Sequence, residues 1–129
     1  MKSDEEILML CDAARQTCFD IHVYFKPGFL EKIYQKALAH RLETAGHRVI
    51  EQAPLIVRDK DGTPVGEYFA DLIVGDCLII EIKTCKGLAD EHIAQIFGSL
   101  RASRTIHGLL VNFGTAKLEI RKFAVTPKS

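Results

Sequence analysis

Hydrophobic residues recur with a helical period in three stretches of the chain, and the first of these covers residues 3–24. Ser3 and Glu6 have the spacing of a capping box, in which each side chain accepts a bond from the backbone N–H of the other residue. Apolar positions then return every three or four residues, which predicts an amphipathic helix. This stripe consists of Ile7, Leu10, Cys11, Ala14, Cys18 and Ile21.

A second helical pattern covers residues 29–45 and is bounded by Pro27-Gly28 and Gly46, residue types that interrupt helices. Glu31 falls at the edge of its apolar stripe, so we expect the carboxylate to point toward the sheet or its margin. The alternative is a glutamate that only stabilises the helix N-terminus through the dipole. Tyr34 is predicted to be a core residue with a hydrogen-bonded hydroxyl. The stripe consists of Leu30, Ile33, Tyr34, Ala37, Leu38 and Leu42.

The third helical pattern covers residues 88–103 and carries Asp90 and Glu91 in its first turn, where the dipole favours acids. Gln95 falls opposite the apolar face, which argues against a role at the sheet. His92 lies near it, and we interpret this histidine as a helix-surface residue rather than a ligand. The apolar face consists of Ala89, Ile93, Ile96, Phe97 and Leu100.

Shorter apolar runs predict the strands. Residues 47–58 form the first, and Pro54 within it indicates an edge strand or a bulge. After a turn at 59–62, residues 65–85 form a hairpin, and residues 107–113 and 117–125 complete the set. A meander of three strands that crosses through a helix into a further strand makes a mixed sheet with helices on its faces. The sequence therefore predicts one α/β domain over residues 1–129.

Three charged residues interrupt the predicted hairpin: Asp71, Glu81 and Lys83. Glu81 and Lys83 are two apart on one strand, so they face the same side, roughly 6.6 Å apart along it. If Gly75-Asp76 alone forms the loop, Asp71 faces away from Glu81. If the loop also includes Cys77, Asp71 lies directly opposite Glu81 with Cβ atoms about 5 Å apart. The register thus decides whether the three residues can form one site.

Two carboxylates at that spacing repel each other unless a positive charge lies between them, and a divalent cation or the ammonium of Lys83 could supply it. Magnesium takes oxygen ligands and keeps waters, one of which can become a nucleophile. A nearby lysine could orient that water or stabilise a phosphate in the transition state. The alternative is a cross-strand ion pair on a solvated face. The nearly continuous apolar run at 78–82 favours the site, because it indicates a strand covered on both faces.

Composition narrows the class of protein. Of 129 residues, 47% are hydrophobic and 26% charged, as in ordinary globular domains. Lys+Arg and Asp+Glu each number 17, so any phosphate-binding surface must be local, and a strong non-specific DNA binder is disfavoured. No apolar run has the length of a membrane span, and residues 2–6 do not resemble a signal peptide. We expect a cytoplasmic protein whose cysteines are reduced core thiols, since they form no C-x-x-C pair: Cys11, Cys18, Cys77 and Cys85.

Five short blocks carry a family resemblance. The first is Gly28-Phe-Leu-Glu31-Lys-Ile-Tyr34. The later ones are Tyr68-Phe-Ala-Asp71-Leu-Ile-Val, Ile79-Ile-Glu81-Ile-Lys83, His92-Ile-Ala-Gln95 and Leu110-Val-Asn112-Phe113-Gly114. In this order they resemble the GxxExxY protein family, which is grouped with the PD-(D/E)XK nuclease superfamily, over residues 5–123. Two positions depart from the pattern: Ala70 replaces the proline of the superfamily's name, and Ser99 stands where an aromatic residue is expected.

The resemblance implies a restriction-endonuclease-like αβββαβ core with an extra N-terminal helix, in agreement with the element order above. It also implies a nuclease that uses Mg²⁺ or Mn²⁺ and acts on nucleic acid, with DNA the expected substrate. Asp71 and Glu81 would be the acidic metal ligands, with the Ile82 carbonyl as a third. Lys83 would be the catalytic lysine, and Glu31 and Gln95 would complete the site.

Two functions follow as hypotheses. The first is metal-dependent hydrolysis of phosphodiester bonds, which the intact set of Glu31, Asp71, Glu81 and Lys83 favours. The second is an inert module that binds nucleic acid or a protein partner, which the neutral charge and small size favour. A homodimer would enlarge the binding surface. Candidates for contacts with the phosphate backbone are Lys26, Lys32, Lys86, Arg101 and Arg104.

Overall fold

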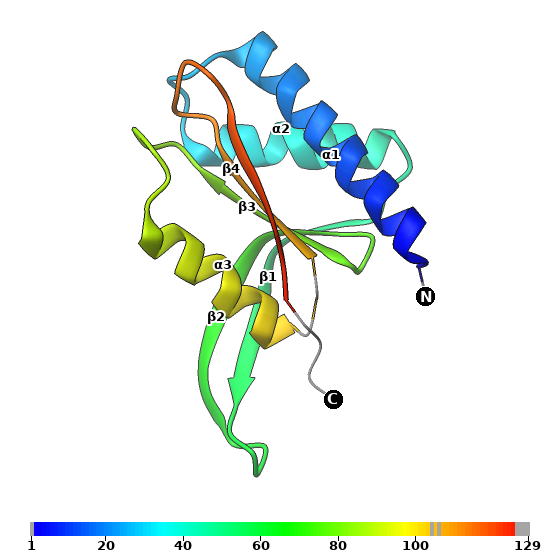
Figure 1. Cartoon of the computed structure of the whole chain (residues 1–129), viewed down its shortest axis with the longest axis vertical. Coiled ribbons are helices and arrows are strands. Elements are labelled where there is room, and N and C mark those ends of the chain that lie inside the picture. The colour runs from blue at the N-terminus through cyan, green and yellow to red at the C-terminus, as the bar shows by residue number, and fades with distance from the viewer. Residues whose placement is uncertain (1, 104, 106, 126–129) are drawn as a thin grey trace.

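A mixed sheet with the strand order β1-β2-β3-β4-β5 forms the middle layer of the molecule (Figure 1). The structure is a computed structural model and describes residues 2–103, 105 and 107–125. Its helices are α1 (Asp4–Phe25), α2 (Glu31–Thr44) and α3 (Asp90–Ser103). Its strands are β1 (Val49–Arg58), β2 (Pro64–Val74), β3 (Leu78–Lys83), β4 (His107–Asn112) and β5 (Glu119–Ala124).

Strand directions follow the predicted topology. β1, β2 and β3 form an antiparallel meander, β3 and β4 are parallel, and β5 returns antiparallel to β4. The parallel pair requires a crossover, and α3 provides it. The predicted element order and the α/β class are therefore confirmed, and the arrangement is that of a restriction-endonuclease-like domain with an additional N-terminal helix.

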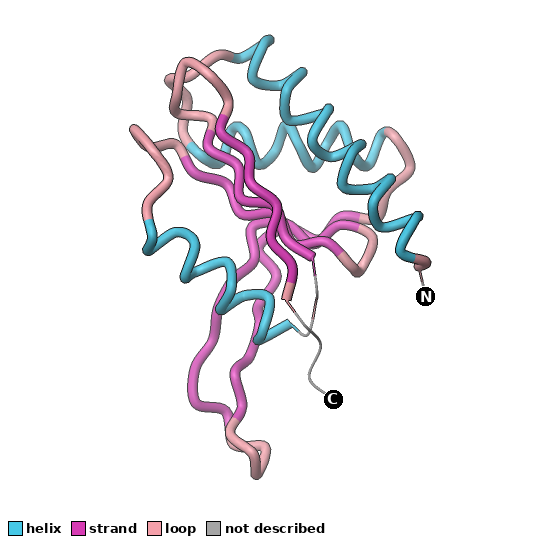
Figure 2. The backbone as a smooth tube through the Cα atoms, in the orientation of Figure 1, coloured by secondary structure: helices cyan, strands magenta, loops and turns pink. Residues whose placement is uncertain are grey.

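Helices cover both faces of the sheet (Figure 2). α1 and α2 lie on one face and pack on Leu78, Ile80 and Ile82 of β3. α3 lies on the other face and packs on Ile79 of the same strand. Because side chains alternate along a strand, Glu81 belongs to the α3 face. This two-sided burial explains why β3 reads as a nearly continuous apolar run.

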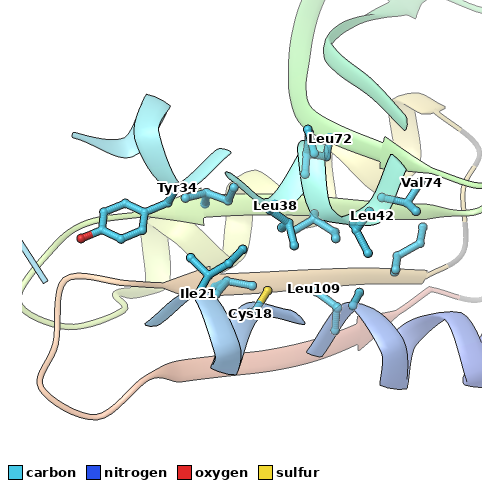
Figure 3. Packing of buried hydrophobic residues seen from close by; sticks show 14 of the residues in the cluster. Cys18, Ile21, Tyr34, Leu38, Leu42, Leu72, Val74 and Leu109 are labelled. Carbon is cyan, nitrogen blue, oxygen red and sulfur yellow. The ribbon is translucent and has the colours of Figure 1, made fainter. Parts of the chain in front are cut away.

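The larger of the two cores lies between α1, α2 and the sheet (Figure 3). The predicted capping box at Ser3 and Glu6 is present and begins α1. The predicted stripe is confirmed, because the buried residues of α1 are Leu10, Cys11, Ala14, Cys18 and Ile21. Tyr34 is fully buried and stacks on Phe113, with ring centroids 4.6 Å apart. Its hydroxyl donates to the Lys26 carbonyl and accepts from the Phe29 N–H, as predicted.

The predicted inner face of α2 is wrong in part. Leu30 and Ile33 are 76% and 40% exposed, whereas Gln35 is only 7% exposed. At 100° per residue, the buried face is rotated by roughly a quarter of a turn from the apolar stripe. The rotation is possible because the buried amide of Gln35 is hydrogen-bonded to residues of β1.

β1 lies at the edge of the sheet, as Pro54 predicts. Together with β2 it forms a long ribbon that projects beyond α3 (Figure 1). Tyr68 of β2 lies against Gly98 of α3, where an added Cβ would come within 2.7 Å of the tyrosine ring. The four cysteines are free, and Cys11 and Cys18 are buried, as expected. Cys77 and Cys85 are only partly buried, so the expectation of core thiols is wrong for these two. Among the described residues, none of the helices combines the length and hydropathy needed to cross a bilayer.

Candidate active site

The register of the β2–β3 hairpin decides where Asp71 points. Leu72 pairs with Ile80 and Val74 with Leu78, so Gly75-Asp76-Cys77 form a three-residue loop. The same register, continued by one pair, sets Asp71 opposite Glu81. Of the two loops that the sequence leaves open, the structure has the one that brings both carboxylates to the same face.

Glu81 is an almost fully buried carboxyl group with 2% of its surface exposed. Its Oε1 has no hydrogen-bond partner among the described residues, and neither has the hydroxyl of the buried Ser99. Burial raises the pKa of Glu81 to about 8, and the nearby Asp71 carboxylate adds to the rise. The Ser99 hydroxyl beside it lowers that pKa only in part. At neutral pH Glu81 therefore carries a proton in the metal-free protein.

Asp71 lies beside Glu81 and is held by two donors. Its Oδ2 accepts from the Ile82 N–H at 2.7 Å, and its Oδ1 accepts from Gln52 Nε2 at 3.0 Å. Each oxygen keeps a further lone pair, so Asp71 can still bind a cation. β1, β2 and β3 thus all contribute to the orientation of this carboxylate.

Lys83 and Gln95 meet across the α3 face of the sheet. Lys83 Nζ donates to Gln95 Oε1 at 2.9 Å. The expectation that Gln95 lies on the far side of α3 is therefore wrong. The buried arc of α3 is centred on Ile96, Ser99 and Leu100, which turns Gln95 toward β3.

His92 is partly buried and takes part in the start of α3. Its Nδ1 accepts from the Ala89 N–H at 3.0 Å, which satisfies one of the free donors of the helix N-terminus. The surface position that the sequence predicts is therefore wrong in part, because this side chain is partly buried.

Glu31 reaches the end of β3 from the first turn of α2. Its Oε1 accepts from the Thr84 N–H at 3.3 Å, one residue beyond Lys83. The Glu31 carboxylate therefore points toward the margin of the sheet, and as the acid in the first turn of α2 it also has the position that the helix dipole favours. α2 and α3 thus each bring one polar side chain to the same end of β3.

Asn112 anchors the loop that follows β3. Its side chain bonds to both the N–H and the carbonyl of Cys85, each at 3.0 Å. Gly114 lies so close that an added Cβ would come within 2.6 Å of the Cys85 nitrogen. The Phe113 N–H also donates to the Lys83 carbonyl at 2.9 Å. These contacts hold the C-terminal end of β3, and with it Lys83, in place.

The donor set suits magnesium better than zinc. Within the described ranges, no three His, Cys, Asp or Glu side chains gather into a metal-binding group. Magnesium is commonly held by one or two carboxylates together with waters and substrate phosphates. Asp71 and Glu81 supply two such carboxylates, and Oε1 of Glu81 has no other partner among the described residues. A cation that bound there would have to displace the proton of Glu81.

A family model described as the PD-(D/E)XK nuclease superfamily matches residues 9–123. The chain belongs to this superfamily. Members of this superfamily are generally nucleases that use divalent metals. The chain is therefore a nuclease-type domain, and its family implies a nucleic-acid substrate. Searches of curated proteins and of solved structures gave no significant match.

The sequence did not point to Gln35 or Gln52, and it marked Ser99 only as a departure from the family pattern, although Gln52 bonds to Asp71, Gln35 bonds to Gln52 and Ser99 lies by Glu81 in this PD-(D/E)XK domain. Gln35 and Ser99 are buried positions within helices, where polarity alone predicts exposure. Gln52 is close to Asp71 only through strand pairing and an unusual backbone angle. The signal that could have found it is the register of β1 against β2.

Four of the five candidate cations for backbone contacts are exposed: Lys26, Lys32, Lys86 and Arg101. Lys32 follows Glu31 directly, and Lys86 lies three residues beyond Lys83, so both lie near the end of β3 that carries the candidate site. Arg104 falls outside the described residues.

Proposed function

We propose that the protein is a metal-dependent nuclease that hydrolyses phosphodiester bonds of nucleic acid, with DNA as its substrate. The observation that carries this proposal is the pair of carboxyl groups on β2 and β3. Glu81 is buried with an unpartnered oxygen and a pKa raised to about 8, directly across from Asp71. A buried acid beside a second acid is costly for stability, and such perturbed groups concentrate at functional sites.

Asp71 and Glu81 would hold Mg²⁺ or Mn²⁺ between them, with the Ile82 carbonyl as a third ligand. When bound, such a cation supplies an activated water and neutralises charge on the phosphate. Glu81 would bind the cation as a carboxylate, its proton having passed to solvent. Asp71 keeps its orientation through the Ile82 N–H and the Gln52 amide.

Lys83 would position the water or stabilise the phosphoryl oxygens through its ammonium group. Gln95 supports this role because its Oε1 accepts from Lys83 Nζ and so restricts where that nitrogen lies. Glu31 would complete the polar margin of the site, next to Thr84. Exposed Lys26, Lys32, Lys86 and Arg101 would contact phosphates of the substrate without reading its sequence.

Within the superfamily, we propose membership of the GxxExxY family. Gly28, Glu31 and Tyr34 support it: Tyr34 fastens the turn between α1 and α2 through its hydroxyl, and Glu31 reaches the end of β3. The four free thiols support a reducing compartment, which we take to be the cytoplasm.

A second candidate function is an inert nuclease-fold module that binds nucleic acid or a protein partner. The observation in its favour is that Asp71 and Lys83 are already hydrogen-bonded to neighbouring side chains and backbone. In that case the acidic cluster would be a structural network rather than a metal site.

Two measurements on the wild type and Asp71→Ala separate the two functions. The first is calorimetry with Mg²⁺ and Mn²⁺, and the second is an assay for cleavage of mixed DNA and RNA. We expect binding and metal-dependent cleavage of DNA in the wild type and loss of both in the variant. Absence of binding and of cleavage in the wild type would favour the inert module. Cleavage of RNA alone would correct the proposed substrate.

A further inference from the structure

Gln52 has a backbone conformation that does not belong in a strand. Three non-glycine residues of the described chain have a positive φ: Lys26, Gln52 and Asp76. Lys26 ends α1 and Asp76 lies in the β2–β3 loop, where such angles are common. Gln52, at φ 48°, lies inside β1. A residue with a Cβ keeps such an angle only where its surroundings hold it there, and such positions cluster at functional sites.

The irregular residue lies across from Asp71. Glu51 pairs with Leu72 and Ala53 with Ala70, so Gln52 is the β1 residue at the level of Asp71 and is skipped by the strand pairing. Its side chain replaces the missing backbone contact. Gln52 Nε2 donates to Asp71 Oδ1 at 3.0 Å and to Gln35 Oε1 at 2.7 Å. Both hydrogens of the amide are therefore in use.

The Glu51 carboxylate, at the other end of this chain of hydrogen bonds, decides which group donates in each bond. Gln35 Nε2 donates to Glu51 Oε1 at 3.1 Å, and Lys36 Nζ donates to Glu51 Oε2 at 2.9 Å. Because a carboxylate can only accept, Gln35 must present its nitrogen to Glu51 and its oxygen to Gln52. Gln52 must then present its nitrogen to Gln35, and the second hydrogen of that nitrogen falls to Asp71.

We propose that Gln52 is a positioning residue that orients the Asp71 carboxylate for metal binding, supported from α2 by Gln35 and from β1 by Glu51. This inference rests on the proposed role of Asp71 as a metal ligand. The strained backbone of β1 at Gln52 would then serve to bring this amide to Asp71. Gln52 would act through Asp71 rather than as a metal ligand itself.

Gln52→Gly tests this role, because glycine adopts a φ of 48° without strain and removes only the side chain. We expect the variant to fold with an unfolding midpoint close to that of the wild type and to bind Mn²⁺ about 10- to 100-fold more weakly by calorimetry. The matched control is Gln16→Ala. Gln16 Nε2 also donates to an aspartate, Asp20, at 3.0 Å, but on the exposed surface of α1. Its loss should leave Mn²⁺ affinity unchanged. Equal Mn²⁺ affinity in Gln52→Gly and the wild type would overturn the proposal.

A second measurement needs no metal. Urea midpoints of the chelator-treated wild type, Gln52→Gly, Asp71→Ala and the double variant form a cycle that reports whether Gln52 and Asp71 interact. We expect a smaller midpoint shift for the double variant than the sum of the two single shifts. Additive shifts would overturn the role of Gln52 whatever the metal result. A wild type that binds no metal, with non-additive shifts, would instead refute the proposed nuclease and leave Gln52 as the residue that orients Asp71.

Discussion

The buried carboxyl group of Glu81 should make the stability of the metal-free protein depend on pH. Its pKa is raised from 4.5 to about 8 by burial and by Asp71. Between these values the folded protein keeps a proton that the unfolded chain has released. The free energy of unfolding of the metal-free protein should therefore fall as the pH rises from 5 to 8, by on the order of a few kcal/mol.

Denaturant unfolding at several pH values in the presence of a chelator measures this slope, and Glu81→Gln is the matched variant because it cannot ionise. We expect the fall to be absent in Glu81→Gln. His107, whose pKa is lowered by burial, acts in the opposite direction near pH 6.5 in both proteins and cancels in the comparison. Parallel curves for the two proteins would contradict the protonated state of Glu81.

Lys83 should matter for the reaction more than for metal binding. Lys83→Met keeps the length of the side chain but removes the ammonium. We expect cleavage to fall by a factor of about 10² or more, with Mn²⁺ affinity within a few-fold of wild type. Lys86→Met, at an exposed position in the following loop, should change cleavage only a few-fold. Equal losses in both variants would mean that Lys83 contributes only general positive charge.

At the scale of elements, the β4–β5 turn holds the end of β3. Gly114→Ala would drive a methyl group into the backbone of Cys85, at 2.6–2.7 Å from its atoms. We expect the free energy of unfolding to fall by about 1–3 kcal/mol. Gly87→Ala is the matched control in the loop after β3, because an added Cβ there meets nothing within 4 Å. Denaturant unfolding measures both, and equal losses would contradict the close approach.

The elements themselves could be predicted from the sequence because each carries a local signal, such as the capping box at Ser3 or the proline of an edge strand at Pro54. Which side chains face the core is harder to predict from the sequence than where the elements lie. The two hairpin registers differ by one loop residue, and local patterns do not choose between them. The apolar stripe of α2 predicts the wrong inner face, because Gln35 is buried against partners that lie in β1, 16 and 17 positions away along the chain.

Some residues of the candidate site can likewise be predicted from the sequence, and others cannot. Asp71, Glu81 and Lys83 stand out because charge is unexpected in an apolar hairpin. A helical wheel puts Gln95 on the wrong side of α3, because it counts apolar residues and gives no weight to the buried Ser99. Gln52 had no signal at all, because its role comes from strand pairing and a backbone angle.

At the scale of the whole molecule, the balance of 17 basic and 17 acidic residues limits how strongly any nucleic acid can be held. If Lys26, Lys32, Lys86 and Arg101 each neutralise one phosphate, the slope of log K against log salt is about −3 to −4. Fluorescence anisotropy of labelled DNA with Glu81→Gln would measure it. Lys32→Ala should reduce the slope by about 1, whereas Arg48→Ala, beside Asp76 at the other end of β3, should leave it unchanged. A slope near zero would exclude these cations as the binding surface.

The sheet has two open edges, and one of them is β1. An exposed edge strand invites strand addition by another chain and so invites aggregation. Pro54 has no N–H to offer such a strand, and the positive φ of Gln52 turns the backbone out of the extended conformation two residues earlier. A strand added at β1 would lose hydrogen bonds at both positions, so the irregularity that brings an amide to Asp71 should also disfavour self-association through this edge. Straightening this strand to gain stability would remove both the support of the acidic pair and the safeguard against self-association.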